Sequence, residues 1–346
     1  MKLETAKAIV NKEVLSARER KDKEGLRFDM FGGEPLLRFS LIKELCMWIW
    51  DTIKDVKIDI FITTNGTLLD DDKKTWLEQH KEKINLIMSV DGKDDVQESN
   101  RGCHSTDLPV RWALDTMPNC FLSMTVSRKS LAKFADELIY FHEKGYRIEA
   151  KPAQGEDWQV GDGKLYEAQL ERIADYYLSH PDVTPIYLFK EVSYVHLLNN
   201  EPNEKYGKTC GIIKEIVAYD VDGNMFPCHH FMPNVNGRND ILEYLKTVDF
   251  SDDSLFADAE CMQCDILKIC RTCCARNLNE RGDLSKRDKR ACQIILAENK
   301  VVSSYKIRKY MNKKEKLKPQ EALDLKAAIK CYRICQDFEE VFYRKN

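Results

Sequence analysis

The sequence of 346 residues has no long apolar run and no excess of charge of one sign. No window approaches the roughly 18–20 uninterrupted apolar residues that a membrane helix requires, and acidic residues stand where an export signal would have its apolar stretch. The 54 Lys and Arg residues are balanced by 57 Asp and Glu residues, whereas a nucleic-acid-binding protein usually has a basic excess. We therefore expect a cytoplasmic protein that binds neither membrane nor nucleic acid.

Cysteine is scarce in the first part of the chain and abundant later. Only Cys46, Cys103 and Cys120 precede residue 210, whereas eight cysteines fall between residues 210 and 292. An odd total of 13, in a chain without an export signal, disfavours a disulfide framework and favours metal or cluster ligation.

Residues 1–155 show alternating helix and strand patterns. The expected strands are short and apolar on both faces, which is typical of parallel strands joined by crossover helices. The pattern predicts an open α/β sheet or a barrel, with a ligand site at the carboxyl ends of the strands. The expected strands are residues 26–31, 57–64, 84–90, 120–126 and 146–153.

Three further segments follow. Residues 156–205 are predicted to be a helical connector, and residues 206–295 a cysteine-rich domain in which metal ligation replaces a large core. Residues 296–346 return to a helical pattern. Within them, we expect the Lys-rich stretch 306–318 to be a solvated face, although it could also attract an acidic leader peptide. Cys331 and Cys335 lie one helical turn apart and are expected to face a core.

The spacing of the later cysteines is the most specific pattern in the sequence. Cys210 and Cys228 enclose Gly223, a CxxCxxxxxCxxxC run extends from Cys261 to Cys274, and Cys292 follows. Thiolates two residues apart converge on one metal, and sulfur-only sites select zinc or iron–sulfur clusters. Spacing alone leaves open a zinc-stabilised structural scaffold.

This cysteine order resembles the SPASM domain that follows radical S-adenosylmethionine (radical SAM) enzymes acting on peptides and proteins. Upstream, FGGEP, TTNGTLL and SVDG followed by NRG resemble the strand-end motifs of the radical SAM partial (open) TIM-type barrel. The resemblance implies that a 5′-deoxyadenosyl radical modifies a peptide or protein, such as a ribosomally made precursor peptide, to form a crosslink or an oxidised side chain. It also implies S-adenosylmethionine, two auxiliary 4Fe-4S clusters and a low-potential electron donor.

The resemblance also implies roles for individual residues. Gly32, Gly33 and Glu34 would lie against the amino group of the cofactor, where Gly permits unusual dihedrals and close backbone approach. Asn65 and Ser89 would be further cofactor-binding residues. Relatives often carry a basic residue at the position of Ser123, which leaves recognition of the cofactor's carboxylate open.

For the clusters, the resemblance implies two interleaved ligand sets. Cys210, Cys228 and Cys274 would hold the first cluster, and Cys261, Cys264, Cys270 and Cys292 the second. The first cluster lacks a fourth ligand. The alternatives are Cys273, His229, His230, a distant cysteine or an open site for substrate, and His229 is also a candidate proton acceptor in catalysis.

One family feature has no counterpart in this sequence. Radical SAM enzymes hold their catalytic cluster with a CxxxCxxC loop, and here no cysteine precedes Cys46. We expect that a strand and this loop lie upstream of Met1. The alternative is a cluster-binding partner that has lost catalysis.

Overall fold

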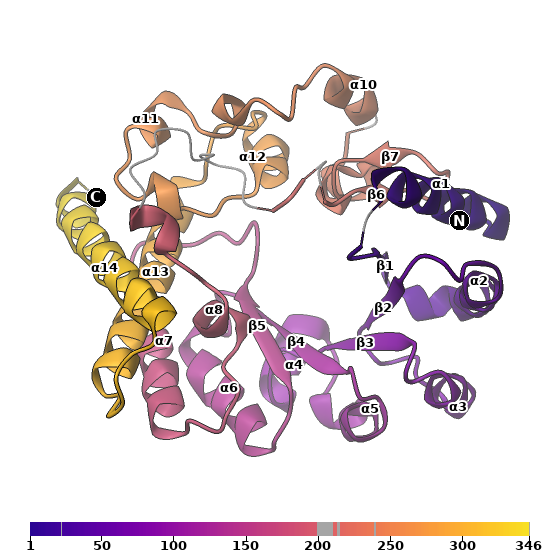
Figure 1. Ribbon diagram of the computed structural model, residues 1–346, viewed down its shortest axis with the longest axis horizontal. Helices are drawn as coiled ribbons and strands as arrows, with labels where there is room; N and C mark the ends of the chain where they lie inside the picture. Colours follow the sequence, from indigo (N-terminus) through magenta and orange to yellow (C-terminus); the bar gives the residue numbers. More distant parts are fainter. Residues whose placement is uncertain (22, 199–209, 213–214, 239, 346) are drawn as a thin grey trace. The chain divides into compact units, whose positions relative to one another are not determined.

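The computed structural model describes residues 1–21, 23–198, 210–212, 215–238 and 240–345 (Figure 1). The chain folds into two compact units, and each is discontinuous in sequence. The first unit consists of Met1–Thr125, Tyr140–Ala150 and Ala218–Phe226. The second consists of Val126–Ile139, Lys151–Val217 and Pro227–Asn346. Residues 218–226, which the sequence places in the cysteine-rich segment, belong to the first unit. The division into four segments stays a prediction.

A five-stranded sheet with the order β1-β2-β3-β4-β5 forms the centre of the α/β fold. β1 to β4 pair in parallel, as the apolar patterns predict. Parallel neighbours in sequence order require crossovers of one hand, which place the connecting helices on the same face of the sheet. Figure 1 shows α2, α3 and α5 along that face. The strands are β1 (Leu26–Met30), β2 (Ile58–Thr64), β3 (Ile84–Ser89), β4 (Phe121–Val126) and β5 (Ile148–Pro152).

The core of the first unit lies between the sheet and its helices. Ile60, Ile62, Leu86, Met88 and Leu122 are fully buried strand residues, and each such side chain contributes about 1.5–3 kcal/mol through burial. The helices of this unit are α1 (Leu3–Arg20), α2 (Phe39–Thr52), α3 (Asp71–Gln79), α4 (Asp94–Arg101) and α5 (Val110–Thr116), with the 3-10 turns η1 (Pro35–Arg38) and η2 (Ser105–Asp107). α6 (Phe134–Glu143), preceded by the 3-10 turn η3 (Leu131–Lys133), runs from the second unit into the first.

A small hairpin of β6 (Ala218–Tyr219) and β7 (Met225–Phe226) completes the first unit. It packs on α1: the Tyr219 hydroxyl donates to Glu13, and Lys12 lies over the Tyr219 ring. Gly223, in the turn, has a φ of +90°, and a Cβ there would approach Thr5 Cγ2 to 3.1 Å. The glycine of the cysteine motif therefore serves this turn and its contact with α1.

The second unit contains the cysteine-rich region and the C-terminal helices. α13 packs against both α7 and α14, and Cys331 and Cys335 on α14 are fully buried, as expected (Figure 1). The helices are α7 (Asp162–Ser179), α8 (Tyr187–Lys190), α9 (Pro233–Asn236), α10 (Ile241–Lys246), α11 (Ala259–Met262), α12 (Cys274–Arg281), α13 (Cys292–Met311) and α14 (Pro319–Lys345). The 3-10 turns are η4 (Val195–Leu198), η5 (His229–Phe231), η6 (Asp253–Phe256), η7 (Leu267–Ile269) and η8 (Lys289–Ala291).

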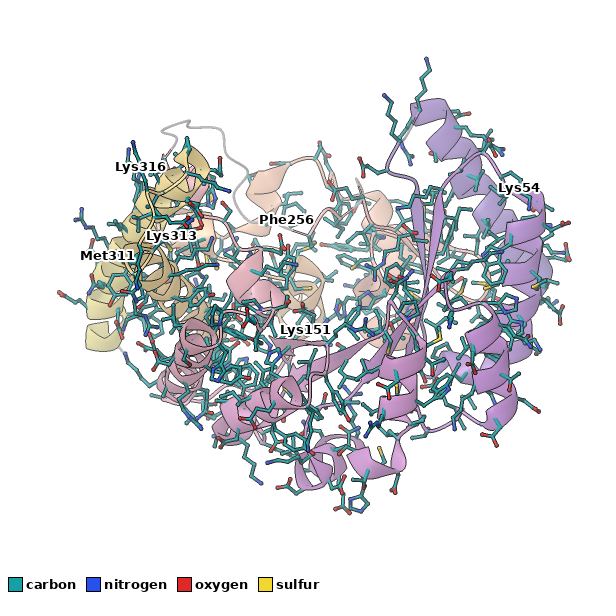
Figure 2. All side chains as sticks on the ribbon, turned by 60° about the horizontal axis from the view of Figure 1, so that its bottom comes forward. Lys54, Lys151, Phe256, Met311, Lys313 and Lys316 are labelled. Carbon is teal, nitrogen blue, oxygen red and sulfur yellow. The ribbon has the colours of Figure 1, made fainter. Side chains whose placement is uncertain are left out.

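The Lys-rich stretch after residue 305 is not simply a solvated face. Lys306, on α13, is only 7% exposed and its ammonium lies 2.8 Å from the Asp324 carboxylate on α14. Lys313, labelled in Figure 2 between the two helices, pairs with Glu321 at 2.8 Å. The expectation of a solvated face is wrong for these two residues, because α14 supplies carboxylates that pair with them. No helix among the described residues is both long and apolar enough to span a membrane.

Candidate functional site

The loop after β1 is fastened to the end of β2 by the carboxylate of Glu34. Glu34 Oε1 accepts hydrogen bonds from Leu36 N at 3.0 Å and from Thr64 Oγ1 at 2.8 Å, and Oε2 accepts one from Asn65 N at 2.9 Å. The first of these bonds caps η1, which begins at Pro35. A carboxylate has about four acceptor positions, so three protein donors leave Glu34 room for one more, such as an ammonium.

Gly32 and Gly33 are exposed, and their surroundings are open. A Cβ at either position would meet no atom within 4 Å, so a ligand can approach this backbone closely. Neither glycine has a positive φ, and the expectation of unusual dihedrals at these positions is therefore wrong. The open backbone beside Glu34 is the feature of this loop that suits a ligand.

Asn65 and Ser89 stand at the ends of β2 and β3. Asn65 Oδ1 accepts hydrogen bonds from Thr67 N at 3.0 Å and Thr67 Oγ1 at 2.8 Å, so its side chain stabilises a turn. Ser89 pairs in register with Ser123 of β4, and within the described part of the chain its hydroxyl has no hydrogen-bond partner. The hydroxyl of Ser89 is thus available to a ligand, whereas the amide oxygen of Asn65 is engaged.

Asp91, two residues beyond β3, has a structural role. Its carboxylate accepts two hydrogen bonds of 2.9 Å from Arg101 and one of 2.8 Å from Thr125 N. The Asp91 side chain is buried and that of Arg101 is partly exposed, and the pair ties the loop to α4 while the bond from Thr125 N ties it to β4. With these donors satisfied, Asp91 holds the strand ends together.

In the second unit, the cysteines fall into two sets of four thiols. The first set consists of Cys210, Cys228, Cys273 and Cys274. Burial, together with the nearby thiols of Cys273 and Cys210, raises the pKa of Cys228 to about 11. Burial also raises the pKa of Cys274, with contributions from the other three. Cys273 has an extended backbone, and Cys274 is the first residue of α12, so both thiols can face the same set.

The second set consists of Cys261, Cys264, Cys270 and Cys292. Burial, together with the neighbouring thiols of Cys270, Cys261 and Cys264, raises the pKa of Cys292 to about 12. Cys261, at 6% exposure, and Cys264 pack against Ala257 and Leu267 in a small apolar cluster. The family resemblance implied the members of this set, and in the structure their thiols lie close enough to act on one another electrostatically.

The thiols of each set are neighbours, but they do not form a closed coordination sphere. Among the described residues, no group of three or more His, Cys, Asp or Glu side chains is placed to hold a metal ion. The donor chemistry nevertheless fits an iron–sulfur cluster or zinc, because each set offers four soft sulfur ligands. The assignment of these cysteines as ligands stays a prediction.

Several polar groups lie beside the first set. The rings of His229 and His230 are 4.0 Å apart, and burial lowers the pKa of His230 to about 4, with the charges of His229, Arg276 and Lys151 adding to this effect. His230 Nδ1 and Arg276 Nε are buried and have no hydrogen-bond partner among the described residues. Lys151, at the end of β5, is labelled in Figure 2. His230 is therefore neutral at pH 7 and a weak base there, and the sequence suggested His229 as the proton acceptor.

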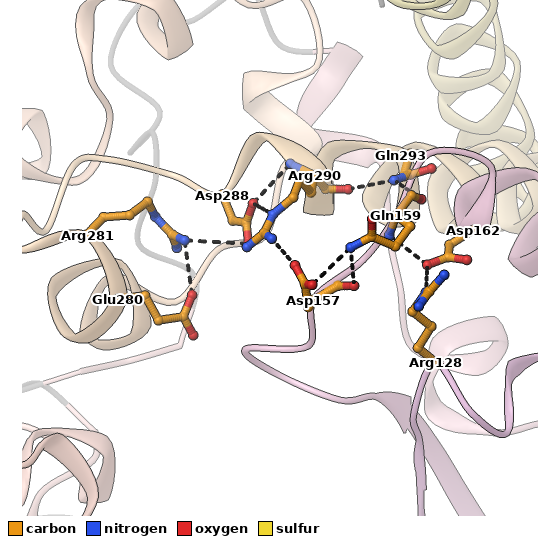
Figure 3. A network of polar contacts seen from close by, with 9 residues as sticks. All are labelled: Arg128, Asp157, Gln159, Asp162, Glu280, Arg281, Asp288, Arg290 and Gln293. Atoms are coloured by element: carbon orange, nitrogen blue, oxygen red, sulfur yellow. Dashed lines mark hydrogen bonds and ion pairs between the residues drawn. The ribbon is translucent and has the colours of Figure 1, made fainter.

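A cavity of about 500 Å³ lies within the second unit, close to the second cysteine set. Its acidic side chains form a network of ion pairs with basic ones (Figure 3). Two basic residues of its wall, Arg287 and Lys289, also face the cysteines, and no sequence motif singled them out.

Comparison with solved structures shows a shared fold. A structure of anSMEcpe with bound AdoMet matches with a TM-score of 0.59 at 18% identity, covering 87% of this chain and 84% of that chain. Streptococcus suis SuiB bound to precursor peptide SuiA matches with a TM-score of 0.53 at 18% identity, covering 82% of this chain and 68% of that one. Another anSMEcpe structure holds AdoMet and the Kp18Cys peptide, at a TM-score of 0.56 and 18% identity, with 83% and 84% covered. No family model matches the sequence, and no curated protein matches it significantly.

Proposed function

We propose that this chain is a radical SAM protein with a SPASM-type cluster domain that modifies a peptide or protein substrate. The observation that carries the proposal is the pair of four-thiol sets in the second unit, in the cysteine order of the SPASM motif. The strand-end loops with Glu34 and Ser89 add support. So does the shared fold with anSMEcpe, which has been seen with AdoMet and a peptide, and with SuiB, which has been seen with a precursor peptide.

In the first unit, Glu34 would accept a hydrogen bond from the ammonium of S-adenosylmethionine at its remaining acceptor position. Gly32 and Gly33 would let the ligand approach the backbone, and the Ser89 hydroxyl would bind the same ligand. Asn65 would contribute by its backbone N–H, which holds Glu34 in place, because its side chain is engaged in a turn. Together with a low-potential cluster, the cofactor supplies a radical that removes a hydrogen atom from the substrate.

In the second unit, the two cysteine sets would each hold a 4Fe-4S cluster, with Cys273 as the fourth ligand of the first. Among the alternatives we favour Cys273, because its thiol lies close enough to raise the pKa of both Cys228 and Cys274. His229 would accept a proton from the substrate beside this cluster, because burial lowers the pKa of His230 to about 4 and so makes that residue a weak base at pH 7.

A second candidate function is that of a cluster-binding partner without radical chemistry, because the two cysteine sets can hold clusters whether or not the first unit binds a cofactor. A zinc-stabilised scaffold is the third, since four thiols also suit zinc. These alternatives differ from the first in metal content and in the products formed.

The test is to measure iron, sulfide and zinc per chain after anaerobic reconstitution, and then 5′-deoxyadenosine after adding S-adenosylmethionine and dithionite. About eight irons per chain would support two four-iron clusters, and about twelve would mean that other cysteines build a third. Iron without deoxyadenosine would support the cluster-binding partner. Zinc with negligible iron would contradict the radical SAM proposal and leave a structural scaffold.

A further inference from the structure

Four basic side chains line the cavity of the second unit, and three of them pair with carboxylates. Arg281 lies 3.0 Å from Glu280 and 3.4 Å from Asp288, and Arg290 lies 3.1 Å from Asp288 and also pairs with Asp157 (Figure 3). Lys289 lies 3.2 Å from Glu260 and 3.7 Å from Asp258. The positive charge of these three residues is thus compensated by neighbouring acidic groups.

The fourth basic residue, Arg287, has no such compensation. It is only 5% exposed, its Nε donates to the carbonyl of Phe256 at 3.2 Å, and its Nη2 has no hydrogen-bond partner among the described residues. Within the same described part of the chain, no carboxylate lies within ion-pair distance of it. A guanidinium is always charged, and a buried charge is unfavourable unless a group of opposite sign lies beside it.

The groups beside Arg287 are the thiols of the second cysteine set. Its Nε donates to the carbonyl of Phe256, and the next residue, Ala257, packs against Cys261 and Cys264. The positive charge of Arg287 favours the thiolate forms of Cys270 and Cys264. Lys289 reaches the same set from its own side, with Nζ 3.1 Å from Cys261 Sγ. Two cations therefore face one set of four sulfurs, and the more deeply buried of the two, Arg287, has no carboxylate partner among the described residues and hydrogen-bonds only to the neutral carbonyl of Phe256.

We propose that Arg287 is the counter-ion of the second cysteine set, and that its positive charge stabilises the reduced form of the cluster held there. The inference rests on the proposed function, because it requires this set to bind an iron–sulfur cluster. Four thiolates give such a cluster a net negative charge, and uptake of one electron from a low-potential donor makes that charge more negative. A buried cation beside the sulfurs favours the reduced state and raises the reduction potential.

The test is an anaerobic titration of the reconstituted protein with dithionite, followed by electron paramagnetic resonance. The transition of the second set is identified as the one that disappears in Cys292→Ala. We expect Arg287→Met to move this midpoint to a more negative potential by the equivalent of at least a tenfold change in the equilibrium constant, about 59 mV for one electron. Arg287→Lys, which keeps the charge, should return the midpoint towards the wild-type value.

Arg290→Met is the matched control, because it also removes one positive charge from the cavity wall but from a residue that is paired with carboxylates. Its midpoint should stay near that of the wild type. If Arg287→Met does not fold, as judged by circular dichroism, the midpoint potential is measured in Arg287→Gln instead. This variant removes the charge and keeps a donor for the Phe256 carbonyl.

Two outcomes would overturn the inference, and they are distinguishable. If the wild type binds two clusters but the charge-removing Arg287 variants leave the midpoint unchanged, or shift it no more than Arg290→Met, the counter-ion role fails and the proposed function stands. If the wild type takes up no iron, both fail together.

Discussion

The hydroxyl of Thr64 donates a 2.8 Å hydrogen bond to the carboxylate of Glu34, across thirty residues of sequence. The same hydroxyl oxygen accepts a bond of 3.0 Å from Gly66 N. A single buried side chain at the end of β2 thereby holds both the loop after β1 and its own turn. The orientation of Glu34, on which cofactor binding would depend, is set by the neighbouring strand.

Replacing Thr64 with Val should destabilise this strand end. The change removes the hydroxyl that accepts from Gly66 N and donates to Glu34, and we expect the free energy of unfolding to fall by about 1–3 kcal/mol. Affinity for S-adenosylmethionine should fall as well, because the carboxylate loses one of its fixed donors. Urea denaturation and calorimetric titration measure the two effects. The control is Thr63→Val on the same strand, and an equal loss in that variant would contradict this explanation.

Removing the thiol of Cys273 should abolish one cluster. With only Cys210, Cys228 and Cys274 left in the first set, we expect the iron content to fall from about eight to about four per chain. Colorimetric iron and sulfide assays after anaerobic reconstitution provide the measurement. Cys103→Ala, which removes a thiol outside both sets, should keep the full iron content. Unchanged iron in Cys273→Ala would show that another group is the fourth ligand.

The stability of the second unit should depend on pH through Glu298. Burial raises its pKa from 4.5 to about 7, and the bond of 3.1 Å from the Tyr166 hydroxyl opposes this only in part. The folded protein keeps a proton there that the unfolded chain loses above pH 4.5. The stabilising contribution is therefore complete at low pH and disappears as the pH rises towards 7.

Glu298→Gln removes this dependence, because the amide does not ionise. We expect the stability of the variant relative to the wild type to increase by about 2 kcal/mol between pH 5 and pH 8. Denaturation midpoints at several pH values supply the comparison. Parallel pH profiles for the two proteins would contradict the raised pKa of Glu298.

The buried ion pair between α13 and α14 should be sensitive to the loss of one partner. Asp324 accepts hydrogen bonds from Lys306 at 2.8 Å and from the Tyr310 hydroxyl at 2.8 Å. Asp324→Ala leaves the Lys306 ammonium buried and unpaired, at an expected loss of about 3 kcal/mol of unfolding free energy. Adding Lys306→Met to this variant should restore part of the loss in thermal denaturation. A double variant less stable than Asp324→Ala would show that the pair is not the source of the effect.

The sequence predicts those parts of the fold that depend on local patterns. All five strands of the sheet lie where apolar runs were found, because parallel strands need buried side chains along their length. Helix α4 was missed: its sequence DDVQESNR has few apolar residues, and it is fixed by Gly102 in the left-handed region and by the bonds of Arg101 to Asp91. Such tertiary contacts leave no periodic signal in the sequence.

For the candidate site, the family resemblance implied the two groups of cysteines but not their surroundings. Cys273 was only one of several alternatives for a fourth ligand, because adjacent residues on a helix point apart. Its backbone is extended and α12 begins only at Cys274, so this argument does not apply to it, and its ligand role stays a prediction. Arg287 belongs to no sequence motif. The role proposed for it depends on the lack of a carboxylate within ion-pair distance among the described residues, which only the three-dimensional structure reveals.

The β6–β7 hairpin bears on how the protein is made. Its contact between Tyr219 and Glu13 joins residues 206 positions apart, and Gly223 fits against Thr5 in the same helix. On the ribosome, α1 therefore emerges long before the segment that covers it, and its hairpin-binding surface is exposed while some two hundred further residues are synthesised. The first unit can reach its final form only after translation has passed residue 226. Its folding is therefore completed while the cysteine-rich region is being synthesised.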